Sequence, residues 1–552
     1  MRFDMRRNIF YIVAFFAIAV IDAAAQDLDP TVEVTRAYEG KLIDVHKPVL
    51  DMAVPDTIHR FDLDFDYAVS DSPYRGSYEF NPYMMSMKPT SSRKKPGTFY
   101  LNAGVGYTLH PVLDLTWSPV LSKDNMTLDV YAGNKSYIGD YYSIREGEDW
   151  FGYDFLSNAG ASYRLGWGSG TFRAGIEYNG AALKDCYKSR MYDAVDVDLS
   201  VSSVASSSRK FVYDLTVAYR FAEDKLKGSA AGNYLSEHNL RFDALIGPSF
   251  GKHKLLIDLG VEYDMYSGGF EAGVGEIMVV PSYVYEKGRL RVDMGLRFSM
   301  LMYKDAMSTI FGSSGQLFYP DVQASYALIP ECLKVYAIAG GGNKINTYSS
   351  MLEDNHHFDM GYGHGLSPIL DVTVERISAA LGLEGRVGTV FSYDVRGGYA
   401  SYANAPMASV VDVEGSILPA IGYSPSQKLF AAAEWNLDME RIRFDGSLVY
   451  TDTWGYDKRF IAPAALSGDA SFIYNWKRRI FAGIDCEWAS GRGNELYEVP
   501  GYADLGLYAE YVATRKMAFW LRAGNLLNMN IQRNLLFAEK GISFTAGIRL
   551  NF

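Results

Sequence analysis

Hydrophobic and polar residues alternate one by one along many segments of this chain. In the clearest segment, 542–552, Ile, Phe, Ala, Ile, Leu and Phe occupy every second position, and Ser, Thr, Gly, Arg and Asn lie between them. The same division occurs at 211–221, 255–265 and 289–302. Because successive side chains of a β-strand point to opposite sides, each segment predicts a strand with one apolar and one polar face.

The predicted strands are long enough to cross a membrane. They run for about 10–14 residues, whereas strands in soluble sheets usually have about 5–6 and a bilayer needs about 9–11. Aromatic residues gather near the strand ends, as in the girdles of membrane barrels. They include Tyr303, Tyr450, Trp454, Tyr456, Tyr474, Trp476 and Trp488. Because every backbone group in lipid must be paired, the sequence predicts an all-β fold, a transmembrane antiparallel β-barrel of the outer membrane over residues 98–552.

The predicted connections are alternately short and long. Short ones, such as 251–253, 286–288 and 476–479, alternate with longer ones, the longest near 342–371. The alternation of short and long connections fails only around 403–441, where the sequence allows either two membrane-crossing strands or one. One crossing restores it and gives about 22 strands, with smaller even numbers as alternatives. Outer-membrane barrels have short periplasmic turns and longer external loops, so an even number places both termini in the periplasm.

The N-terminal region does not show this alternation. In residues 1–25, three arginines precede an apolar run of 13 residues that ends shortly before Ala23-Ala24-Ala25, as in a secretory signal peptide. The run is too short for a helix that spans a hydrocarbon core of about 30 Å, so we expect cleavage rather than a membrane anchor. Residues 26–97 are rich in Pro, Asp and Tyr. We expect an irregular periplasmic or lumenal segment there.

Composition excludes several classes of protein. A net charge of −12 argues against binding to nucleic acid, which usually needs a basic surface. The mean hydropathy of −0.08 excludes a bundle of membrane helices. The three cysteines, Cys186, Cys332 and Cys486, are too widely spaced to form a metal pattern or a disulfide framework.

The sequence does not indicate an enzyme, a cofactor or a resident metal. None of the nucleophile, zinc-protease or nucleotide-binding motifs occurs in a supporting context. His110, before a proline at an external turn, could be half of a Ser–His pair, but the sequence designates no serine. Three histidines and two aspartates of the longest loop could bind a divalent metal, although we favour an ordinary exposed loop. They are Asp354, His356, His357, Asp359 and His364.

Charged residues of both signs lie on the polar face of several predicted strands. In the lumen of a barrel they would stay hydrated and could pair across strands, which favours structural ladders that stiffen a wide barrel. The alternative is an ion or solute path tuned by charge. These residues include Arg220, Asp258, Glu262, Arg289, Arg291, Asp293 and Arg297.

The C-terminal segment 501–552 resembles a known family. Gly524-Asn525-Leu526-Leu527-Asn528 follows the penultimate predicted strand, and the last strand is an alternation containing glycine that ends in an aromatic residue. These features resemble the closing strands of TonB-dependent outer-membrane receptors, and Phe552 resembles the sorting signal that the barrel-assembly machinery reads. The resemblance implies a barrel in the outer membrane of a Gram-negative bacterium.

The chain departs from that family near its N-terminus. Such receptors carry a large plug domain inside the barrel, whereas only the 72 residues of 26–97 lie between the signal peptide and the first predicted strand. The chain therefore resembles a plug-less relative. Within this segment, Thr31, Val32, Glu33, Val34 and Thr35 resemble a TonB box, which couples a receptor to its energiser by β-augmentation. Chance alternation in a β-rich protein is the other explanation.

Two functions from different classes follow from the sequence. The first is a transport component, either a channel or the membrane part of an uptake system. The alternative is a barrel without transport of its own that anchors or docks a periplasmic or surface partner protein. In both cases outer-membrane lipid and the barrel-assembly machinery are expected partners.

Overall fold

The computed structural model describes residues 98–552, apart from short breaks at 108, 122, 124, 145–146, 185–188, 204–209, 228–233, 269–270, 305–313, 358–369 and 414–415. The expected signal peptide (1–25) and the irregular segment (26–97), with its TonB-box-like residues, lie outside the described residues. No helix among the described residues is long and apolar enough to cross a membrane.

The described residues form a long series of strands and one short helix that lies among the later connections. In chain order the elements are β1 (Phe99–Gly106), β2 (Val112–Trp117), β3 (Met126–Tyr142), β4 (Asp149–Trp167), β5 (Gly170–Lys184), β6 (Ser189–Ser203), β7 (Phe211–Lys227), β8 (Leu235–Phe250), β9 (His253–Gly268), β10 (Ala272–Lys287), β11 (Leu290–Lys304), β12 (Ser314–Ile329), β13 (Leu333–Ile345), α2 (Tyr348–Asp354), β14 (Val372–Val387), β15 (Phe391–Val413), β16 (Ser416–Asp438), β17 (Ile442–Trp454), β18 (Phe460–Ile461), β19 (Leu466–Trp476), β20 (Ile480–Ala489), β21 (Arg492–Gly493), β22 (Glu498–Val499), β23 (Tyr502–Thr514), β24 (Met517–Gly524) and β25 (Ser543–Asn551).

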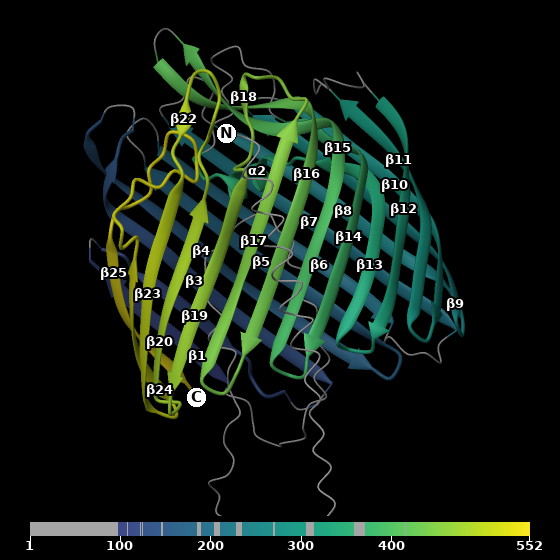
Figure 1. Cartoon of the computed structure of the whole chain (residues 1–552), viewed down its shortest axis with the longest axis horizontal. Helices are drawn as coiled ribbons and strands as arrows, with labels where there is room; N and C mark the ends of the chain where they lie inside the picture. The colour runs from purple at the N-terminus through teal and green to yellow at the C-terminus, as the bar shows by residue number, and fades with distance from the viewer. Residues whose placement is uncertain are drawn as a thin grey trace, which may run out of the picture. The chain divides into compact units, whose positions relative to one another are not determined.

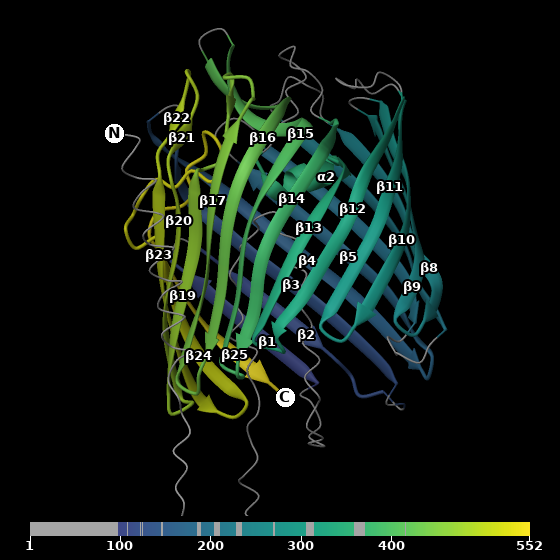
Figure 2. The same cartoon turned by 45° about the vertical axis from the view of Figure 1, so that its right-hand side comes forward.

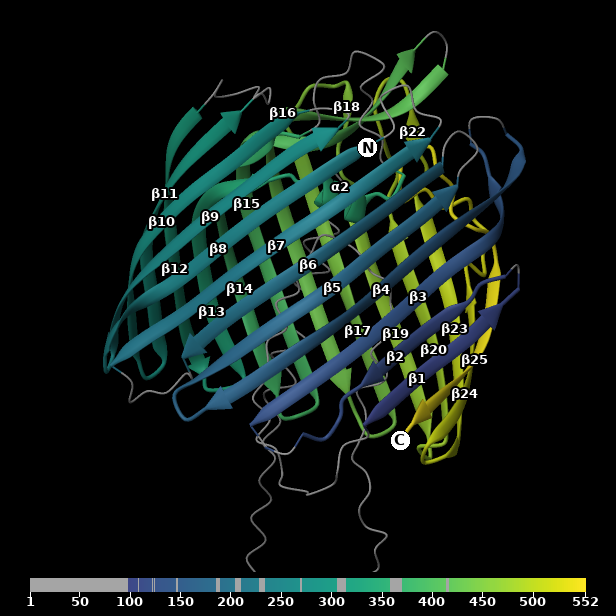
Figure 3. The ribbon, with the colours of Figure 1, turned by 180° about the vertical axis from the view of Figure 1, so that it is seen from behind.

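The long strands close into one barrel. The described residues form a 23-stranded sheet, which includes the two-residue β18 beside β15, so 22 strands make up the wall. All are antiparallel to their neighbours, and β1 pairs with β25 from Tyr100↔Asn551 to Gly106↔Thr545. The ring of strands is visible from both sides in Figures 1 and 3. The predictions of an all-β barrel and of about 22 strands are confirmed, and the C-terminal strand closes the ring.

The apolar face of the strands points outwards. On β25, Phe544 and Ile548 are 45 % and 42 % exposed, whereas Ser543 and Thr545 between and beside them are buried. On β11, Leu296 is 44 % exposed. A closed sheet with an apolar exterior and a polar interior is the arrangement of a barrel that lies in lipid.

Several strands are longer than the 10–14 residues predicted from the alternation, so that prediction is wrong for these strands. β7 has 17 residues and continues past Phe221 to Lys227. In this extension the outward positions are polar: Glu223 and Lys225 form an ion pair of 3.2 Å. A strand that rises above the lipid no longer needs an apolar outer face, so alternation of hydrophobicity marks only its membrane portion.

The two ends of the barrel differ, as Figure 2 shows. One end, here called the turn end, has short connections such as Gly251-Lys252 between β8 and β9. The other, the loop end, carries the long connections and α2. The uncertain region 403–441 is a single hairpin there, because β15 and β16 have 23 residues each and pair from Phe391↔Leu437 to Val413↔Ser416.

Candidate functional site at the loop end

Two connections at the loop end fold onto inward-facing side chains. We call residues 346–357, which follow β13, the helix loop, and residues 525–542, between β24 and β25, the closing loop. Each is held to the wall by a set of polar contacts.

The helix loop places α2 inside the ring of strands (Figure 3). The helix begins after Thr347, whose side chain accepts a hydrogen bond from the Ser350 backbone N–H at 3.1 Å, as an N-cap residue does. Its apolar side is buried among inward-facing side chains of β5 to β10. This core comprises Tyr348, Met351 and Leu352 of the helix with Ala181, Tyr192, Ala194, Ala222, Leu235, Tyr266, Ala272 and Leu370.

Buried polar contacts fix the helix in this position. The Tyr348 hydroxyl donates to the Asp224 carboxylate, which also forms an ion pair with Arg190 at 3.2 Å. The Ser349 backbone N–H donates to Glu237 Oε2 at 2.9 Å. The Arg190 and Asp224 side chains are only 2 % and 3 % exposed, so loss of either partner would leave an uncompensated charge in the interior. Such a loss typically costs about 3–5 kcal/mol.

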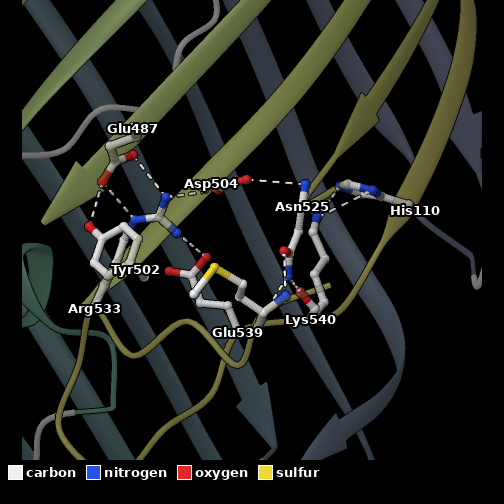
Figure 4. A network of polar contacts seen from close by, with 9 residues as sticks. His110, Glu487, Tyr502, Asp504, Asn525, Arg533, Glu539 and Lys540 are labelled. Carbon is white, nitrogen blue, oxygen red and sulfur yellow. Dashed lines mark hydrogen bonds and ion pairs between the residues drawn. The ribbon is translucent and has the colours of Figure 1, made fainter. Parts of the chain in front are cut away.

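The closing loop is fixed by Arg533, which contacts three carboxylates (Figure 4). Arg533 donates to Oε1 and Oε2 of Glu487 on β20, at 3.0 and 2.8 Å, and to Oδ2 of Asp504 on β23 at 2.9 Å. It also pairs with Glu539 of the closing loop itself. The Tyr502 hydroxyl donates to Glu487 Oε1 at 2.7 Å, and its ring centre lies 5.3 Å from the guanidinium carbon. This forked geometry fixes direction as well as distance.

Further contacts hold the two ends of the closing loop. Asn525 adopts a left-handed conformation (φ 47°), and its backbone N–H donates to Asp504 Oδ1 at 3.1 Å. Its side-chain amide donates to the carbonyl oxygens of Met529 and Lys540, at 2.9 and 3.2 Å. The Lys540 ammonium lies 3.0 Å from Nε2 of His110.

His110 and Lys540 have strongly altered acidity. Burial, supported by the charge of Lys540, lowers the pKa of His110 to about 3. Burial also lowers the pKa of Lys540 to about 8. Because His110 is uncharged at neutral pH, its ring can accept a hydrogen bond from the neighbouring ammonium, and the pair joins the β1–β2 connection to the closing loop.

The two loops meet at one pair of rings. His357 of the helix loop stacks on Phe537 of the closing loop, with ring centres 4.2 Å apart and planes inclined by 13°. Phe537 also forms a backbone bridge with Ser143, which follows β3. The lining of a small pocket beside this contact includes Tyr141, Trp150 and the two stacked rings.

The structure places two of the predicted polar-face charges, Arg220 and Arg297, beside carboxylates of other elements. Arg220 pairs with Asp196 at 2.5 Å and with Glu353 of α2 at 3.2 Å, so it belongs to the site. Arg297 lies 3.5 Å from Asp321 on β12. These contacts are those of a structural ladder, and the function of the charges stays a prediction.

The remaining predicted charges lie away from the two loops. Arg291 lies 4.0 Å from Asp293 on the same strand. Glu262 accepts a hydrogen bond from Asn239 at 3.1 Å, and Arg289 donates to the Leu328 carbonyl at 3.1 Å. Asp258 is also on the inward side of β9. Phe552 is at the closure, where its N–H donates to the Phe99 carbonyl at 2.9 Å.

The structure describes three of the five histidines and aspartates predicted as possible metal ligands: Asp354, His356 and His357. No group of three such side chains in the described ranges could hold a metal ion. The His356 carbonyl accepts a hydrogen bond from Arg190 at 2.6 Å, and His357 takes part in the ring contact with Phe537. Asp359 and His364 lie outside the described residues. His110, considered for a Ser–His pair, lies beside Lys540 and Thr545.

Sequence reasoning missed the residues that hold the loops. Arg533, Tyr348 and Arg190 lie in or beside connections without periodicity. Their partners are distant: Tyr348 and Asp224 are 124 positions apart. The one signal available was the presence of three charged residues, Arg533, Glu539 and Lys540, within an otherwise apolar and amide-rich loop.

The closed wall, its exterior and its strand number define the class of protein: a 22-stranded antiparallel barrel of the outer-membrane type. Its fold is that of TonB-dependent receptors. Similar solved structures include the copper transporter OprC (TM-score 0.61, 11 % identity, 83 % of this chain and 81 % of that chain). The FrpB iron transporter of Neisseria meningitidis, in its apoprotein form, has a TM-score of 0.64 at 9 % identity over 83 % of this chain and 81 % of that chain. The hemophore receptor HasR of Serratia marcescens, in complex with HasA and heme, has a TM-score of 0.59 at 12 % identity over 84 % and 81 %.

At these identities the likeness is one of fold. The sequence matches no protein-family model, and no curated protein matches it. The resemblance seen at the C-terminal end is confirmed at the level of the barrel.

Proposed function

We propose that the protein is a transport barrel of the Gram-negative outer membrane, with access to its lumen controlled by the helix loop and the closing loop. The observation that carries this proposal is the contact of His357 with Phe537. Two loops anchored on different parts of the wall by their own polar clusters meet there, as two halves of a gate would. The turn end and both termini face the periplasm, and the loop end faces the exterior.

The N-terminal region gives this proposal two further parts. In this proposal residues 26–97, which lie outside the described residues, are an irregular segment rather than a plug. Thr31 to Thr35 offer a short strand to a periplasmic energiser. Deletion of 31–35 should then abolish energy-dependent uptake while leaving the heat-dependent shift in gel mobility unchanged. Unchanged uptake after the deletion would indicate a passive channel instead.

A second function, docking of a surface partner, is favoured by a small core above the barrel. Val410, Ile461, Val499 and Leu535 come from four connections or strand extensions and are 2–5 % exposed. This core gives the loop end a defined surface. The structure of HasR includes a bound hemophore, so a barrel of this fold can carry a protein partner.

Conductance in a planar bilayer distinguishes the two functions. The purified full chain should switch between closed and conducting levels as the loops move. A variant in which 348–354 is replaced by a glycine–serine linker should stay in the conducting level, because α2 no longer occupies the lumen. Silence of both proteins, with correct heat-dependent mobility, would contradict transport and favour docking.

A further inference from the structure

The turn end carries positive charge that the gate does not use. The turns 439–441, 477–479 and 515–516 join β16 to β17, β19 to β20 and β23 to β24. They are adjacent on the rim, since β17 pairs with β19 and β20 with β23. All their basic side chains are exposed: Arg441, Lys477, Arg478, Arg479, Arg515 and Lys516. We call these six residues the basic rim. The basic rim is a local cluster of positive charge on a chain whose net charge is −12.

Few carboxylates of the described residues lie beside the basic rim. Among the described residues, Arg478 is its one member with a carboxylate in ion-pair range, Glu440 at 3.7 Å. The two side chains are 62 % and 79 % exposed, so the pair is weak. At the loop end the comparable cation Arg533 has three carboxylate partners.

The basic rim borders an outward-facing aromatic belt. Trp476 and Phe552 are 49 % and 52 % exposed, and Tyr511 is 47 % exposed. Lys477 Nζ lies 5.4 Å from the Trp476 ring centre, and Lys516 Nζ lies 5.3 Å from that of Phe552. Aromatic rings of this kind lie at the headgroup level of a membrane. The cations therefore lie at the depth of the lipid phosphates.

The conformation of one turn indicates that the cations are not there for folding. Lys477 and Arg478 both have positive φ values, 53° and 56°, and the Arg479 N–H donates to the Trp476 carbonyl at 3.1 Å. Turns whose two central residues both have positive φ favour Asn-Gly, because side chains strain the left-handed conformation. Asn-Gly would form the same turn without that strain, so turn formation does not explain Lys-Arg here.

We infer that the basic rim is a binding surface for the phosphate headgroups of anionic phospholipids in the leaflet next to the turn end. The inference goes beyond the transport proposal and requires only that the barrel lies in a bilayer. Lysine and arginine side chains donate hydrogen bonds to phosphate oxygens, and the aromatic belt holds the acyl chains beside them. Each cation near an anionic membrane surface strengthens binding by roughly fivefold. The adjoining belt favours lipid over an acidic protein as the partner.

Titration of the full chain in neutral detergent with phosphatidylglycerol tests this inference, with bound lipid counted by native mass spectrometry. The rim variant is Lys477→Asn with Arg478→Gly, which keeps and relaxes the turn while removing two charges. The control is Lys458→Gln with Arg459→Gln, because Arg459 at the loop end is 80 % exposed. We expect affinity for phosphatidylglycerol to fall at least tenfold in the rim variant and to stay unchanged in the control.

Two further arms identify the ligand. Phosphatidylcholine of the same chain length should bind weakly to all three proteins, and soluble glycerophosphate should not compete with phosphatidylglycerol. Equal affinity of the wild-type chain and the rim variant for phosphatidylglycerol would overturn the inference. So would equal binding of both lipids, or competition by glycerophosphate at the lipid's own concentration, which would indicate a site for free phosphate. Heat-dependent gel mobility verifies that each variant is folded.

Discussion

Replacement of Arg533 with methionine should release the closing loop and leave the barrel closed. The Arg533 side chain is 28 % exposed, and those of Glu487, Asp504 and Glu539 are 26 %, 25 % and 40 % exposed. Loss of one partner of a fully buried pair costs about 3–5 kcal/mol, and exposed pairs contribute about 0–1 kcal/mol. For this half-buried cluster, which would keep three like charges, we expect a cost of about 2–4 kcal/mol. At about 1.4 kcal/mol per factor of ten, the released population rises roughly 30- to 700-fold.

Hydrogen exchange of backbone amides measures this release. Amides of the closing loop, such as that of Glu539, which donates to the Ile531 carbonyl at 2.9 Å, should exchange faster. Amides of β24 and β25 should keep their rates. Arg533→Lys should give an intermediate effect, because a lysine cannot make the forked contacts. Arg459→Gln, at an exposed pair, is the control. Unchanged exchange in the closing loop of Arg533→Met would refute the assignment of Arg533 as its anchor.

Three other perturbations have defined outcomes. Leu296→Arg should lower the free energy of unfolding by about 2–4 kcal/mol if the residue lies near mid-bilayer, while Arg297→Ser should lower it by under about 1 kcal/mol. Unfolding of the reconstituted protein in urea measures both changes. A larger loss for Arg297→Ser than for Leu296→Arg would mean that the assigned faces are inverted. Deletion of 542–552 removes the partner of both β1 and β24, so unpaired backbone groups would face lipid at several kcal/mol each; heat-modifiable protein should vanish from the outer-membrane fraction, and normal amounts would contradict closure by this strand. Since the pKa of His110 is lowered from 6.5 to about 3, the released loop binds a proton that the anchored loop does not, so anchoring weakens as pH falls from about 6.5 towards 3; the protection factors of the closing-loop amides, which correct for the intrinsic pH dependence of exchange, should fall over that range, and a fall confined to alkaline pH would reverse the sign.

The wall of the barrel could be predicted from the sequence because successive side chains of a strand alternate between its two faces, so hydrophobicity repeats every two residues. The exposed Phe544 and Ile548 and the buried Ser543 and Thr545 follow from one rule about which face meets lipid. The prediction of strand length failed where the rule stops. Beyond Phe221 the outer face of β7 meets water. The outward residues Glu223 and Lys225 are charged, so the sequence shows no alternation of hydrophobicity there that would indicate a strand.

The loop contacts could not be predicted because no local rule generates them. Arg190 donates to the His356 carbonyl across 166 positions, and the hydroxyl of Tyr348 reaches Asp224 across 124. Each contact depends on how deeply a loop enters the lumen, and that depth is set by the packing of Met351 and Leu352 on side chains from six strands. The pattern of residues along the chain predicts which face of each strand is apolar, but it does not predict how a loop packs inside the barrel.

Reversible cross-linking of the two loops tests the gate most directly. His357→Cys and Phe537→Cys replace the stacked rings, whose centres are 4.2 Å apart, in a chain whose native cysteines are changed to serine. Single-channel conductance is then recorded after oxidation and again after reduction. The gate predicts that the oxidised protein stays at the closed level and that reduction restores the openings. Conductance that is the same before and after formation of the cross-link would contradict control of the lumen by these loops.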